Sequence, residues 1–141
     1  MSRRLGRETA LQTLFQVDVG RVEPDFALKY TCKEFGVDEQ TAEFARRLVE
    51  GAMANREAID EIVRRLAKEW NLERMANVDR NLLRIAIFEM LYQEDVPLNV
   101  AINEAIELAK HFSGEESAKF VNGILGQLAR ELRESGHKKE V

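Results

Sequence analysis

The sequence predicts an all-α protein of about seven helices. Apolar residues recur at helical spacing along almost the whole chain, and no segment shows the alternation typical of a strand. Only two prolines and eight glycines interrupt the 141 residues, and the runs between them are rich in residues that favour helix. Short connections, without repeat or flexible linker, predict one domain with an N-terminal half of about residues 1–54 and a C-terminal half of about residues 55–135.

Three helices are expected in the N-terminal half. The first covers about residues 3–19 and ends at Gly20, because glycine tolerates the left-handed conformation that follows many helices. Pro24 suits the first turn of a second helix, which stops at Gly36. Asp38 is placed to cap the N-terminus of the third helix with its carboxylate.

Four helices are expected in the C-terminal half. Asn55 is placed to cap the fourth helix, Asp79 to cap the fifth, and Pro97 lies near the start of the sixth. Ser113 and Glu116 have the spacing of a capping box at the start of the seventh. That last helix is expected to bury an apolar stripe formed by Val121, Ile124, Leu125, Leu128 and Leu132.

The composition limits the classes of function. A net charge of -4 gives no overall attraction to nucleic acid, so such binding requires a local basic patch. Cys32 is the single cysteine, which excludes an internal disulfide and a thiolate metal cage. We find no signal peptide and no apolar run long enough to span a bilayer, so we expect a cytoplasmic protein with no membrane partner.

No catalytic constellation is recognisable. Glu107 and His111 are four residues apart and so lack the Glu-x-x-His spacing of helical di-metal sites. Gly123 and Gly126 follow no strand and therefore do not form a phosphate loop. We expect no enzyme activity, no cofactor and no metal.

Three arginines cluster at the start of the first helix. Arg3 and Arg7 are four residues apart and share a helix face, with Arg4 beside them. Cations at a helix N-terminus are electrostatically unfavourable for the helix. The cluster predicts an arm that binds phosphates, although ordinary solvated arginines would give the same pattern.

The fifth helix is apolar on nearly all sides, whereas a surface helix shows a single apolar stripe. Two interpretations fit. The helix is central to the core, or part of it is covered by another protein. The second interpretation predicts that Leu82 or Ala86 lies at an exposed apolar patch.

The last helix carries a second face. Glu116, Lys119 and Phe120 lie away from the buried stripe, and Phe120 either fills the core or is presented to a ligand. Asn122 and Gly123 are weak helix formers in mid-helix, and Gly123 suggests a close approach of another backbone.

Three stretches give the sequence a resemblance to the NusB family. They are RRLGRETALQTLFQ (Arg3–Gln16), VDRNLLRIAIFEML (Val78–Leu91), and VPLNVAINEAIELAKHF with SGEESAKFVNGIL (Val96–Leu125). The resemblance covers nearly the whole chain in the same order. It implies a fold of two packed helical bundles.

The resemblance also implies a function. NusB proteins bind the boxA element of nascent RNA with NusE, a small-subunit ribosomal protein, and help RNA polymerase to read through terminators in ribosomal RNA operons. It implies that RNA meets Arg3, Arg4, Arg7, Phe15, Glu73, Phe112, Glu116, Lys119 and Phe120. It implies that NusE meets Asp79, Leu82, Leu83 and Ala86. Some members are thought to form a homodimer through the RNA surface, and the residues do not decide this point.

The physical chemistry agrees with this resemblance. Single-stranded RNA needs cations for phosphates and aromatic faces for base stacking, and the Glu116 carboxylate can accept hydrogen bonds from base amino groups. There are departures. Leu5 and Gly6 interrupt the arginine cluster, Phe15 stands where tyrosine is frequent, and Glu116 where aspartate is frequent.

Two other functions fit the same sequence. One is a helical module that binds only proteins, with its arginines in solvent. The other is the similar RNA-binding domain of certain ribosomal-RNA cytosine methyltransferases. The sequence contains no Rossmann-type methyl-donor site, so the catalytic part of such an enzyme would have to lie elsewhere.

Overall fold

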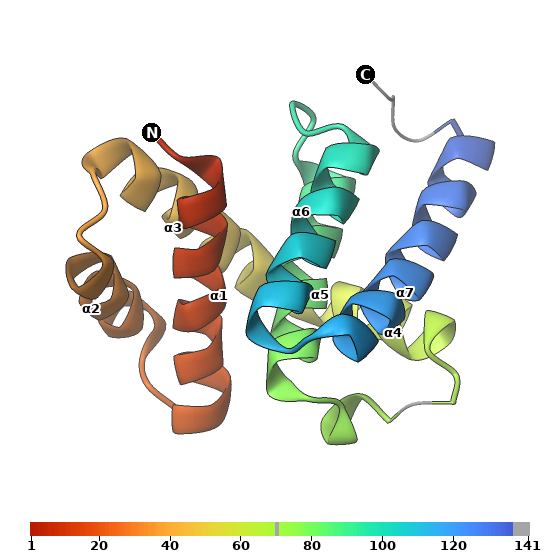
Figure 1. The fold of residues 1–141 in the computed structure, drawn as a ribbon, viewed down its shortest axis with the longest axis horizontal. Coiled ribbons are helices and arrows are strands. Elements are labelled where there is room, and N and C mark those ends of the chain that lie inside the picture. Colours follow the sequence, from red (N-terminus) through yellow and green to blue (C-terminus); the bar gives the residue numbers. More distant parts are fainter. Residues whose placement is uncertain (70, 137–141) are drawn as a thin grey trace.

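The computed structural model describes residues 1–69 and 71–136, and within them it shows seven α-helices, one turn of 3-10 helix and no strand (Figure 1). The elements are α1 (Arg3–Gly20), α2 (Pro24–Phe35), α3 (Glu39–Ala54), α4 (Arg56–Leu66), η1 (Leu72–Arg74), α5 (Asn77–Tyr92), α6 (Leu98–Phe112) and α7 (Glu115–Glu134). The predicted all-α class with about seven helices is confirmed. None of these helices is long and apolar enough to cross a membrane.

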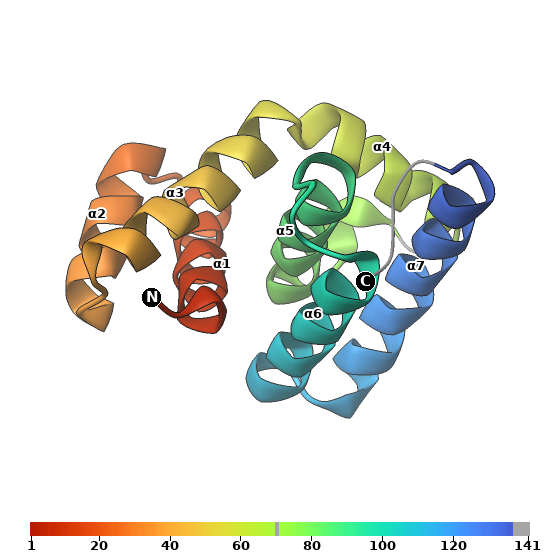
Figure 2. The same ribbon diagram turned by 90° about the horizontal axis from the view of Figure 1, so that it is seen from above.

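The helices form two packed groups. α1 packs against α2 and α3, while α5 lies at the centre of the second group and contacts α4, α6 and α7. α5 also contacts α1 and α3, so it joins the two groups. Figure 2 shows α3 passing almost directly into α4 along one edge of the molecule. One continuous apolar core results, with α5 in its middle.

Two glycines allow α1 and α3 to approach large aromatic side chains. A Cβ atom at Gly51 would lie 2.0 Å from the ring of Phe88, where α3 crosses α5. A Cβ atom at Gly6 would lie 2.5 Å from the ring of Phe44, where α1 crosses α3. Gly123 differs, because a Cβ atom there would meet nothing within 4 Å. The predicted close backbone approach at Gly123 is therefore wrong within this chain.

The predicted helix ends of the N-terminal half are largely confirmed. α2 begins at Pro24 and ends at Gly36, which takes the left-handed conformation with φ 62°. Asp38 caps α3, and its carboxylate accepts a hydrogen bond of 2.7 Å from the backbone N–H three residues on. α1 is the exception, because it includes Gly20, and Arg21 takes the left-handed conformation with φ 54°.

The predicted side-chain caps of the C-terminal half are wrong in detail, because Asn55 and Asp79 make other hydrogen bonds and no side chain caps α7. Asn55 separates α3 from α4, but its amide donates back to a carbonyl of α3 at 2.8 Å. α5 begins two residues before Asp79, whose carboxylate accepts a hydrogen bond from α7 instead. The capping box of Ser113 and Glu116 is absent, since Gly114 with φ 108° takes the N-cap position of α7 and no side chain caps that helix. The predicted apolar stripe of α7 is buried as expected.

Candidate nucleic-acid interface

α1 and α6 run in the same direction on one side of the molecule (Figure 1). Arg4 in the first turn of α1 contacts Glu104 near the middle of α6. Near their ends, Phe15 and Phe112 line one hollow of about 160 Å³. Phe112 is 45% exposed and Phe15 is partly buried. The structure thus brings together two aromatic residues that the resemblance assigned to RNA binding and that are distant in sequence.

A larger hollow of about 590 Å³ lies between the start of α7 and the segment that leads into α5. Glu116, Lys119 and Phe120 all line it. Glu116 and Lys119 are exposed, while Phe120 packs partly against the core, so it both fills space and lines the hollow. One carboxylate, one cation and one aromatic ring therefore share this site.

The hollow contains a cation that sequence reasoning missed. Arg74, an exposed residue of η1, lines the 590 Å³ hollow together with Met75. Glu73, its predicted neighbour in the site, instead lines a separate hollow of about 280 Å³ and lies 3.5 Å from the guanidinium of Arg64. Arg74 belongs to a short irregular segment without helical periodicity, so its charge was the one signal that could have identified it.

The three arginines at the start of α1 have different environments. Arg3 contacts Asp95 at 2.8 Å, and Arg4 makes two hydrogen bonds of 3.0 and 2.7 Å with Glu104. The side chains of Arg3 and Arg4 are 39% and 57% exposed. These two arginines remain accessible to a phosphate.

Arg7 is buried and serves the fold. It is 3% exposed and makes two hydrogen bonds of 2.8 and 2.7 Å with the equally buried Glu89 of α5. A phosphate cannot reach a guanidinium enclosed in this way. The predicted phosphate contact of Arg7 is therefore wrong, because at this position α1 faces α5 and the guanidinium is held by Glu89.

The carboxylates opposite the arm are held ionised. The hydrogen bond from Arg4 lowers the pKa of Glu104, although partial burial acts in the other direction. The hydrogen bond from Arg3 likewise lowers the pKa of Asp95. The arm is thus paired with carboxylates of the C-terminal half in the free protein, and a phosphate would have to compete with them.

The residues predicted to bind a protein partner divide into two sets. Asp79 is half-exposed in the first turn of α5 and accepts a hydrogen bond from the hydroxyl of Ser117. Leu82, Leu83 and Ala86 are 1%, 0% and 2% exposed. The predicted exposed apolar patch at Leu82 or Ala86 is wrong, because five helices surround α5. The interpretation of α5 as a central core helix is confirmed.

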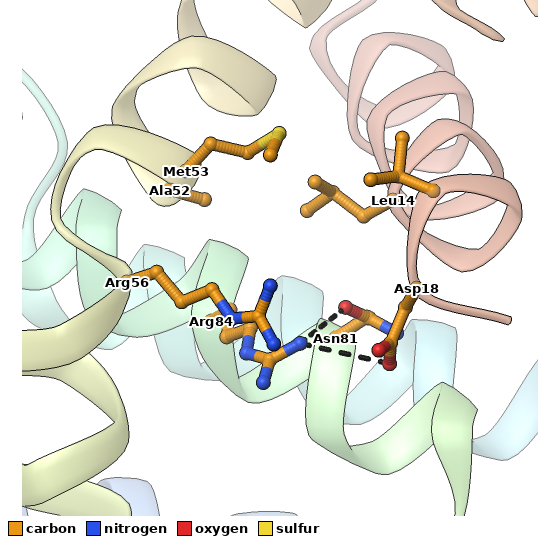
Figure 3. Close-up of a pocket in the computed structure, with 8 residues that line it drawn as sticks. Leu14, Asp18, Ala52, Met53, Arg56, Asn81 and Arg84 are labelled. Carbon is orange, nitrogen blue, oxygen red and sulfur yellow. Dashed lines mark hydrogen bonds and ion pairs between the residues drawn. The ribbon is translucent and has the colours of Figure 1, made fainter. Parts of the chain in front are cut away.

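A network of buried and partly buried ion pairs ties α5 to α1 and α4, and sequence reasoning did not assign it. Arg84 makes two hydrogen bonds of 2.9 and 3.0 Å with Asp60 of α4. Arg80 makes two of 2.9 and 2.7 Å with Asp18 of α1. Figure 3 shows Arg84 also directed at Asp18 and Asn81 across a small internal hollow. The network holds the two helical groups in place.

Asp18 stays ionised at the centre of this network. Burial would raise its pKa, but hydrogen bonds from Arg80 and Asn81 outweigh burial and lower it. Within the described part of the chain, no group of three His, Cys, Asp or Glu residues is arranged to hold a metal ion. The charged groups here have the arrangement of a structural network.

The comparisons with known proteins agree with this geometry. Residues 4–130 match the model of the NusB family. The transcription antitermination protein NusB of Heliobacterium modesticaldum is 74% identical, over 99% of this chain and 68% of its own length. Among solved structures, T. maritima NusB superposes with a TM-score of 0.86 at 39% identity, covering 93% of this chain and 92% of that one.

A second solved structure contains NusB with ligands. It is a crystal structure of the antitermination factors NusB and NusE in complex with dsRNA. Its matching chain superposes with a TM-score of 0.83 at 27% identity, covering 92% of this chain and 96% of that one. The family match over residues 4–130 and the level of identity to named relatives lead to one conclusion. The chain belongs to the NusB family.

Proposed function

We propose that the chain is a transcription antitermination factor that binds boxA-type single-stranded RNA together with NusE. In this role the complex joins RNA polymerase and promotes read-through in ribosomal RNA operons. The relatives named for antitermination and the solved complex of NusB, NusE and RNA support the proposal. The observation that carries it is the 590 Å³ hollow, where Glu116, Lys119 and Phe120 meet beside Asp79.

The side chains of the hollow have complementary roles toward RNA. The ring of Phe120 offers a face on which a base can stack, and Lys119 supplies a charge for a phosphate. Glu116 cannot bind a phosphate, but it can accept a hydrogen bond from the amino group of a base such as cytosine. Phe112 on α6 and Phe15 on α1 offer further aromatic surface around a second hollow, and Arg3 and Arg4 lie in the first turn of the same α1.

NusE is proposed to bind at the first turn of α5. Asp79 lines the hollow and is half-exposed, so a partner bound there would lie next to the RNA. Leu82, Leu83 and Ala86 act by holding α5 in the core, not by touching the partner. Two ligands that share one hollow should strengthen each other by adding contacts.

The test is a complete binding cycle with a boxA RNA and purified NusE. Fluorescence anisotropy would give the RNA affinity with and without NusE, and calorimetry the NusE affinity with and without RNA. Each ligand should strengthen the other by the same factor, on the order of 5- to 150-fold, because coupling free energy is reciprocal. If RNA binds equally well with and without NusE, and NusE equally well with and without RNA, the two surfaces are independent and the shared site is contradicted.

Phe120→Ala should weaken RNA binding by about 1–3 kcal/mol, the usual contribution of one stacked base. NusE affinity without RNA should not change. Phe26→Ala is the matched control, because Phe26 on α2 is 65% exposed and remote from the hollow. If both variants bind RNA as the wild type does, the hollow is not the RNA site. If the chain binds NusE but no RNA, it is a protein-only module. Sedimentation of the free chain would test whether it forms a homodimer.

A further inference from the structure

Three guanidinium groups surround the ring of Phe44, which is 2% exposed. The guanidinium carbons of Arg3, Arg7 and Arg47 lie 5.1, 5.5 and 5.5 Å from the ring centroid. Arg7 is enclosed, but Arg3 from α1 and Arg47 from α3 reach the surface. Cation–π attraction holds such groups over a ring. Phe44 therefore places two accessible cations from different helices around one fixed point.

Both cations face the connection between α5 and α6. Arg3 donates to the carboxylate of Asp95 at 2.8 Å, and Arg47 donates to the side-chain oxygen of Gln93 at 3.5 Å. The hydrogen bond from Arg3 is the main cause of the lowered pKa of Asp95, and the charge of Arg47 acts in the same direction. One carboxylate thus lies in the field of two guanidiniums.

The neighbouring arginines of α3 differ in how far their charge is neutralised. Arg46 lies 3.3 Å from Asp25, 3.5 Å from Glu50 and 3.9 Å from Glu43. Arg47 is exposed, and in the described part of the chain no carboxylate lies within 4.0 Å of its guanidinium. Arg47 therefore keeps the capacity to bind an anion, whereas Arg46 does not.

We propose that Arg3 and Arg47 form a binding site for one phosphodiester of the RNA backbone, which Asp95 occupies when RNA is absent. The Asp95 side chain is 56% exposed, and exposed ion pairs contribute little net free energy, so a phosphate can displace its carboxylate. Guanidinium groups pair with phosphate through two parallel hydrogen bonds. Arg47 thus takes the role in the arm that buried Arg7 cannot fill. The inference rests on the proposed RNA binding.

The experiment measures RNA affinity over a range of KCl concentrations with boxA RNA and NusE. Arg47→Ala should weaken binding about fivefold, as for one exposed charge-assisted hydrogen bond. It should also reduce the slope of log affinity against log salt by about 0.7, the value for one phosphate on single-stranded nucleic acid. Arg46→Ala removes the same charge one residue away and should change neither quantity. Asp95→Asn should strengthen binding about two- to fivefold, because it removes the competing carboxylate.

The outcomes separate the site from the function. Equal behaviour of Arg47→Ala and Arg46→Ala, with RNA still bound, would overturn the phosphate site and leave the proposed function intact. If the wild-type protein does not bind the RNA at all, both the phosphate site and the proposed function are overturned. Unchanged affinity in Asp95→Asn would overturn the role of Asp95 as the occupant. Arg47→Lys should restore the salt slope that Arg47→Ala loses, because lysine keeps the charge that meets the phosphate. A merely structural role of Arg47 predicts no such difference in slope between the two variants. Melting curves would check that each variant folds.

Discussion

Arg7→Ala should destabilise the protein by about 3–5 kcal/mol, the usual cost of removing one partner of a buried ion pair. The side chains of Arg7 and Glu89 are 4% and 1% exposed, and two hydrogen bonds of 2.8 and 2.7 Å join them. The substitution leaves the buried Glu89 carboxylate without the guanidinium that faces it. For a chain of this size, such a loss lowers the melting temperature by about 10 °C or more.

Arg4→Ala is the matched control, because Arg4 is 57% exposed in its pair with Glu104. Its loss should change stability far less than the loss of Arg7, because an exposed ion pair contributes little net free energy. Urea denaturation followed by circular dichroism measures both variants. The double variant Arg7→Met, Glu89→Met should recover much of the stability, since it removes both charges and keeps apolar volume. A normal urea midpoint in Arg7→Ala, combined with a reduced salt slope of RNA binding, would refute the structural role and restore Arg7 to the phosphate arm.

Two further predictions concern packing and pH. Gly51→Ala should destabilise the protein by about 1–3 kcal/mol, because the new methyl group meets the Phe88 ring. Gly123→Ala should stabilise it by about 0.5–1 kcal/mol, since that position is open. Melting temperatures equal to that of the wild type would contradict both predictions. Because the pKa of Asp18 is lowered from 3.8 on folding, its contribution to stability is present at neutral pH and is lost as the pH falls through the folded value. Asp18→Asn should therefore destabilise the protein by about 1–3 kcal/mol at pH about 7. It should also reduce the fall in melting temperature as the pH is lowered into the acid range. An unchanged fall would argue against this ionised network.

Local signals in the sequence were enough for the element types and for several helix ends. Pro24, Gly36 and Asp38 act through the backbone of their own helix, so their roles could be predicted without a tertiary structure. Asp79 has the same type of side chain as Asp38, yet it bonds to Ser117 on α7, 38 positions away in sequence. A capping residue beside a packed helix has two competing partners, and the sequence alone cannot say which partner it takes.

The arginine arm shows the same limit at the candidate site. Arg3 and Arg7 share a helix face, so periodicity treats them as equivalent. The fold separates them, because Arg7 meets Glu89, 82 positions away, inside the core, while Arg3 meets Asp95 at the surface. Arg47 joins them through Phe44, a contact that no spacing along the chain indicates. Cation clusters could be located from sequence, but which members remain accessible depends on the carboxylates that the fold brings opposite them.

The apolar helix α5 contains charged residues whose partners lie on other helices. Arg80, Arg84 and Glu89 interrupt a helix that five others surround, and ionised groups there require partners of opposite charge. Each finds its partner on another helix, in Asp18, Asp60 and Arg7. Breaking any one pair leaves a buried or partly buried charge without this partner, so the same residues that make this stretch resemble its family hold α1 and α4 against α5. Asp79, Glu116 and Lys119 lie outside these pairs and reach the surface, so substitutions there should leave the charged contacts of α5 intact.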